Sequence, residues 1–145
     1  MISRNALYEF IEGLIEAAAV GDALYEAVIY RNIRNSVDQN RKVVRIEVLT
    51  GEHCMTSEDM RKELGVEATI QCWVLPEGTG LTDLDAAADA SFDMSREIFE
   101  AIAGNTSLGG RVCDCDFREF ETGHANLATA KRGVTYLDGV INHAS

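Results

Sequence analysis

Apolar residues recur at intervals of three and four in two segments of the chain, the spacing that places side chains on one face of a helix. The first segment, residues 4–19, carries glutamates on its other faces and is followed by Gly21, a residue typical of helix C-termini. The second segment, residues 82–103, begins with Thr82 and Asp85, which resemble a helix-capping pair. We expect one stripe of this second helix to anchor the core: Leu84, Ala88, Phe92, Phe99 and Ile102, with Ser91 and Ile98 beside it.

Runs rich in β-branched and aromatic residues predict strands between and after the two helices. Alternation within two of the runs predicts which side chains share a face of a sheet. In one run Val44, Ile46 and Val48 are expected on the same face, and in the next Cys72 and Trp73 are expected on opposite faces. The predicted strands cover residues 24–30, 42–49, 66–75, 111–120 and about 126–137.

Residues 51–65, with the sequence GEHCMTSEDMRKELG, are polar and lack a sustained apolar stripe. Thr56 with Asp59 is a possible start for one helical turn that Gly65 would close. We interpret the segment as a mobile arm between two paired strands.

The length of 145 residues predicts one domain, residues 1–145, that is large enough to fold without disulfides or structural metals. Glu9, Glu12 and Glu16 interrupt the first apolar stretch, so we expect neither a signal peptide nor a membrane span there. The protein is therefore expected in the cytoplasm, where its four cysteines would be reduced thiols.

Acidic residues outnumber basic ones by 24 to 13, which gives a formal net charge of -11 and argues against binding to a phosphate backbone. The charge is unevenly distributed: residues 31–45 carry +4, whereas residues 77–116 carry -7. Within the acidic segment, the second helix repeats carboxylates every fourth residue, at Asp85, Asp89, Asp93 and Glu97. The simplest interpretation of this line is a solvated outer face.

The candidate chemistry is weak. Cys113 and Cys115 are too closely spaced for a typical zinc pair and alternate with Asp114 and Asp116, so we interpret them as core thiols on a half-buried strand. The two aspartates beside Arg118 need no acid–base role to be explained. The three histidines are expected in exposed loops, and no glycine pattern matches a phosphate-binding loop. The sequence therefore predicts no catalytic residue, no metal site and no cofactor.

Five stretches form a distinctive combination: QCWVLPEGTG, TDLDAAADASFDMSREIF, NTSLGG, RVCDCDFREFE and GVTY. Together they resemble the tail-terminator proteins of long, non-contractile-tailed phages and prophages, of the lambda tail-terminator type. The similar part covers residues 66–137, about half of the chain. Its most recognisable feature is a turn with Thr106, Leu108, Gly109 and Gly110, after a helix that contains Leu84, Asp85, Ala88 and Asp89.

The resemblance implies an α+β fold, with a mostly antiparallel sheet of about four to five strands and two main helices packed on one face. It also implies a structural virion protein at the head-proximal end of the tail, assembled in the host cytoplasm, and not an enzyme. Such minor tail proteins form a homo-oligomeric ring, usually a hexamer, that caps the tail tube, stops its elongation and provides the docking surface for the head connector or neck. The expected partners are thus other copies of the chain, the tail tube protein and the connector, while DNA passes through without specific binding and no membrane is involved.

Two alternatives stay open at this point. A neck or head-completion protein would have a similar small domain, and a metal- or thiol-dependent enzyme would use Cys113, Cys115 and His53. For the ring, the opposite charges of the two segments predict a heterologous contact between neighbouring subunits. Its predicted residues are Arg31, Arg34 and Arg41 on one subunit and Asp85, Asp89 and Asp93 on the next.

Overall fold

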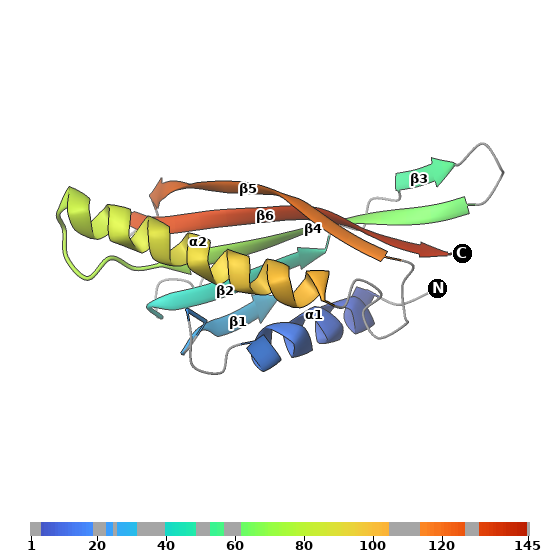
Figure 1. Cartoon of the computed structure of the whole chain (residues 1–145), viewed down its shortest axis with the longest axis horizontal. Helices are drawn as coiled ribbons and strands as arrows, with labels where there is room; N and C mark the ends of the chain where they lie inside the picture. The colour runs from blue at the N-terminus through green and yellow to red at the C-terminus, as the bar shows by residue number, and fades with distance from the viewer. Residues whose placement is uncertain are drawn as a thin grey trace.

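The computed structural model describes residues 4–18, 23–24, 26–31, 40–48, 53–56, 62–104, 114–126 and 131–144. Two helices and six strands follow one another along these residues (Figure 1). They are α1 (Arg4–Ala18), β1 (Val28–Arg31), β2 (Lys42–Val48), β3 (His53–Thr56), β4 (Lys62–Val74), α2 (Leu81–Ala103), β5 (Asp114–Asn126) and β6 (Lys131–Ala144).

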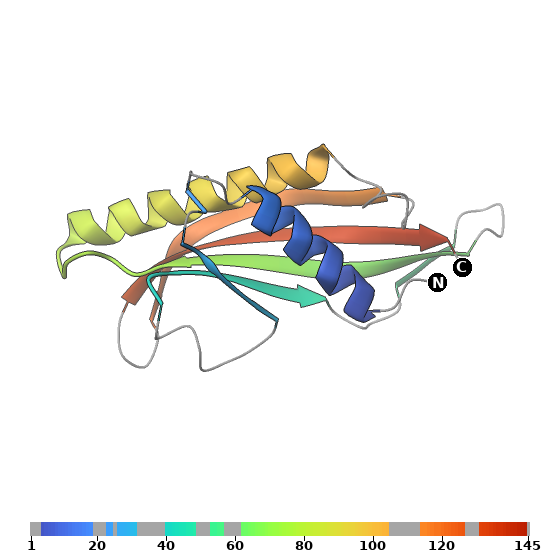
Figure 2. The same ribbon diagram turned by 90° about the horizontal axis from the view of Figure 1, so that it is seen from below.

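The six strands form one sheet in the order β1-β2-β4-β6-β5, with β3 paired to β4 beside this path. The pair β1 and β2 is parallel, and every other pair is antiparallel. Both helices lie on the same side of the sheet (Figure 2). The predicted α+β fold is therefore confirmed, including a mostly antiparallel sheet and two helices on one face.

The strands bury residues on both of their faces. The alternation predicted for residues 42–49 and 66–75 is confirmed, because the two clusters contain alternate residues of β2 and β4. The larger cluster, under the helices, includes Val44, Ile46, Val48, Ile70 and Cys72. The smaller cluster, on the open face of the sheet, contains Val43, Trp73 and Val134, with Tyr30 and Tyr136 packed against them.

Helix α2 differs in detail from the prediction. Its N-cap is Gly80, with no hydrogen bond from a capping side chain, so the predicted pair of Thr82 and Asp85 does not cap the helix. Phe92 was expected in the core stripe but is 38% exposed. The buried stripe of α2 lies to one side of Phe92 and contains Leu84, Ala87, Ala88, Ser91, Met94, Ser95, Ile98 and Ile102.

Several strand boundaries also differ. The first predicted strand began at residue 24, but Leu24 belongs to a turn in which the Ala27 N–H donates to the Leu24 carbonyl (2.9 Å), and β1 starts at Val28. Glu26 has a φ of 63°, a left-handed conformation that fits a turn better than a strand. The last strand was expected to end near residue 137, yet β6 continues to Ala144.

Residues 51–65, the predicted arm, include strand structure that the sequence did not indicate. His53–Thr56 pair with Lys62–Gly65 in antiparallel register, and this part of the sheet extends beyond the end of α2 (Figure 1). Residues 57–61 lie outside the described part of the chain. The predicted location between two paired strands is correct, because β2 and β4 on either side of the segment pair with each other. Within it, β3 forms a hairpin with the N-terminal residues of β4, and the mobility of the arm stays a prediction.

Candidate functional site

Arg31, the first of the predicted interface residues, is held by side chains of its own chain. Its guanidinium forms an ion pair with Glu12, donates to the Asn5 side chain (2.6 Å) and lies 5.3 Å from the centre of the Tyr8 ring. The hydrogen bond that Arg31 donates to the Glu12 carboxylate is the main cause of a raised pKa for Arg31, because it stabilises the charged form. These contacts anchor β1 to α1, so Arg31 serves the fold rather than offering a free cation to a neighbour.

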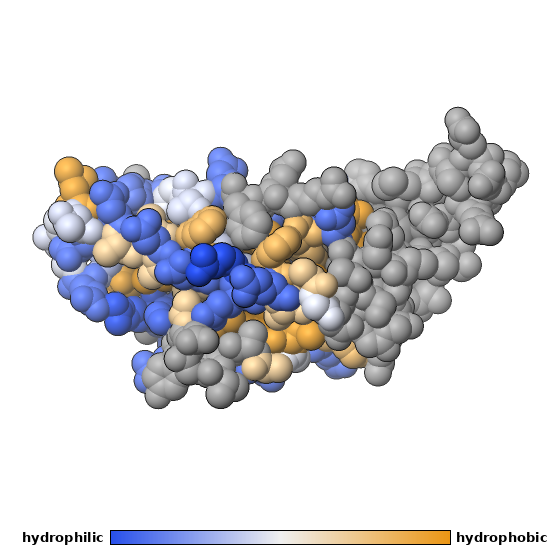
Figure 3. Space-filling view, viewed as in Figure 1, coloured by the Kyte–Doolittle hydropathy of each residue, from blue (hydrophilic) through white to orange (hydrophobic). Residues whose placement is uncertain are grey.

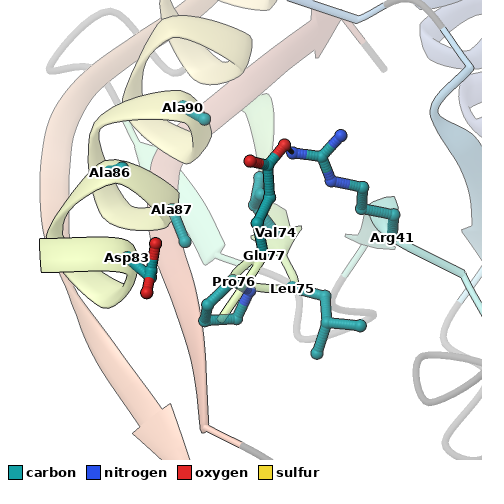
Figure 4. A pocket seen from close by; sticks show the side chains of 9 residues that line it. All are labelled: Arg41, Val74, Leu75, Pro76, Glu77, Asp83, Ala86, Ala87 and Ala90. Carbon is teal, nitrogen blue, oxygen red and sulfur yellow. Dashed lines mark hydrogen bonds and ion pairs between the residues drawn. The ribbon is translucent and has the colours of Figure 1, made fainter. Parts of the chain in front are cut away.

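Arg41 has a more exposed position. It forms an ion pair with Glu77 in which both side chains are more than half exposed, and Figure 4 shows the two groups pointing toward each other. They border a cavity of about 170 Å³ between the end of β4 and the first turns of α2, where Ala86, Ala87 and Ala90 form the helix side. Arg34 lies outside the described residues.

The acidic line of α2 divides into two parts. Asp85, Asp89 and Asp93 are exposed, as a solvated face requires, and Asp85 lies 3.4 Å from the His124 side chain. Glu97 is instead partly buried and accepts hydrogen bonds from two backbone N–H groups in the turn before β1. The predicted uniform line is therefore wrong at Glu97. Figure 3 shows hydrophilic residues along α2 with hydrophobic ones on both sides.

A second cavity, of about 460 Å³, lies at the N-terminal end of α2. Its lining is mainly apolar and comes from the β4–α2 connection, the first turn of the helix and the start of β6. Lys131 is the only cation in this lining, and Glu77, the only acid, is already paired with Arg41. The lining residues are Leu75, Pro76, Glu77, Gly78, Thr79, Gly80, Leu84 and Lys131.

The open face of the sheet carries a group of carboxylates that are scattered along the sequence and form no local motif there. They occupy alternate positions on four adjacent strands, on the side opposite the helices. Burial raises the pKa of the Tyr136 phenol at the border of this group, and the neighbouring carboxylates of Glu121 and Asp138 raise it further, while Arg45 opposes them. The described members are Glu47, Glu67, Asp116, Glu121 and Asp138, which we call the acidic face.

Next to the acidic face, polar contacts surround the smaller core cluster. The Trp73 indole donates to the Gln71 side chain (3.2 Å) and meets the Tyr136 ring edge-on at 6.3 Å. Arg132 is 1% exposed and donates to the Asn40 carbonyl (2.9 Å). The sequence gives no sign that this arginine is buried, although its alternation with Val134 and Tyr136 places it on the same face of the strand.

The remaining candidates contribute no site. Cys72 is a buried thiol whose pKa is raised by burial, and the described residues contain no cluster of three or more metal-ligating side chains. His124 lies in β5 and is exposed, so it is not the loop residue that was expected. Cys113 and the turn with Thr106, Leu108, Gly109 and Gly110 lie outside the described residues, as does the side chain of Cys115.

No protein-family model matches the chain, and no curated protein matches it significantly. In the described residues, neither helix has the length and apolar character needed to cross a membrane. The surface features of the described residues that bear on function are therefore the acidic face and the two cavities at the start of α2.

Proposed function

We propose that this chain is a structural subunit of a phage tail terminator. Copies form a ring, usually of six subunits, that caps the tail tube, stops its elongation and provides the docking surface for the head connector or neck. The proposed family rests on the resemblance in the short motifs of residues 66–137. The proposed orientation of each subunit in the ring rests on the difference between the two faces of its sheet.

The observation that carries the proposal is the acidic face. The helices cover one face of the sheet, and on the other face Glu47, Glu67, Asp116, Glu121 and Asp138 come from four strands. Duplex DNA carries about one negative charge per 1.7 Å of its axis. A channel lined by this face repels the phosphates and lets DNA slide without binding.

The test is electron microscopy of the purified protein mixed with growing tail tubes. We expect a ring at one end of each tube and a narrower distribution of tube lengths than with tube protein alone. An unrelated acidic protein of similar size is the control for charge effects on tube growth. Tubes that grow to the same lengths and carry no ring contradict the proposal.

A further inference from the structure

We draw no further inference here: the strongest candidate, the outer edge of strand β5 at the end of the sheet, carries no proposal because nothing in the described part of the structure shows what covers it.

Discussion

At the scale of single residues, Glu97 shows that one member of a regular pattern can have a different role from the others. It continues the four-residue repeat of Asp85, Asp89 and Asp93, yet its carboxylate accepts hydrogen bonds from the N–H groups of Ala23 (2.9 Å) and Leu24 (3.2 Å). Lys42 donates to the carbonyl of Ala23 (2.9 Å). Both backbone groups of Ala23 are thus bound by charged side chains, which tie the turn before β1 to α2 and β2. Hydrogen bonds to charged groups are stronger than neutral ones.

Replacing Glu97 with Ala should therefore lower the free energy of unfolding by about 1–3 kcal/mol, because two partly buried N–H groups lose their acceptor. Glu97→Gln should have a smaller effect, since its amide oxygen can accept one of the two bonds. Asp93→Ala is the matched control on the exposed part of the line and should change stability by no more than about 0.5 kcal/mol. Urea denaturation measures all three variants. Equal losses for Glu97→Ala and Asp93→Ala would show that the turn does not depend on this carboxylate.

At the scale of helices and strands, the close packing of α2 on β6 depends on a glycine. A Cβ atom at Gly133 would lie 2.3 Å from the backbone carbon of Ala87 and the backbone nitrogen of Ala88. Both atoms belong to the backbone of α2, so neither can move away unless the helix moves with it. By contrast, a Cβ atom at Gly123 on the neighbouring β5 would meet nothing within 4 Å.

Gly133→Ala should consequently destabilise the protein by about 1–3 kcal/mol or more, because the methyl group pushes α2 away from the sheet. Gly123→Ala, the matched control, should change the free energy of unfolding by no more than about 0.5 kcal/mol. Thermal and urea unfolding of the two variants provide the comparison. A stability loss that is the same at both positions would mean that strand propensity, and not helix packing, sets the effect.

Comparison of the elements with the sequence shows which kinds of structure a local pattern can predict. Both helices and the alternating faces of β2 and β4 were predictable, because each has a complete hydrophobic period of its own. The end of β6 was not, since Asp138, Gly139 and Asn142 have low strand propensity. These residues are in a strand because β4 pairs with them on one side and β5 on the other. The parallel pairing of β1 and β2 likewise depends on the tertiary arrangement, and no local sequence pattern predicts it.

The candidate site was less predictable than the fold for the same reason. The sequence showed the acidic repeat of α2, because all of its members lie on one helix. The acidic face is assembled from single carboxylates on separate strands, among them Glu47, Glu67 and Asp138, and only the sheet order brings them together. The two cavities similarly require the β4–α2 connection to lie beside residues that are distant in the chain, such as Arg41 and Lys131.

At the scale of the whole molecule, carboxylates are exposed on both broad surfaces, but the two groups have different surroundings. Those of α2 lie on a helix surface that also exposes Phe92 and Arg96. Those of the acidic face lie on a sheet surface that the helices leave uncovered. If DNA passes along the acidic face and not along the helices, charge reversal at the acidic face should retain DNA and charge reversal on the helices should not, even when the net charge of the two variants is the same.

The double variant Glu121→Lys with Asp138→Lys should therefore retain duplex DNA on ring-capped tubes at low salt, because two lysines replace two carboxylates of the proposed channel. Glu16→Lys with Glu100→Lys is the matched control, since it changes two exposed acids of the helices and leaves the predicted contact residues Asp85, Asp89 and Asp93 unchanged. Cosedimentation of labelled DNA with capped tubes measures the retention, which should fall steeply as salt rises. The unchanged protein and the control should retain little DNA. Equal retention by the two double variants would place the channel elsewhere, because the acidic face would then have no special relation to the path of the DNA.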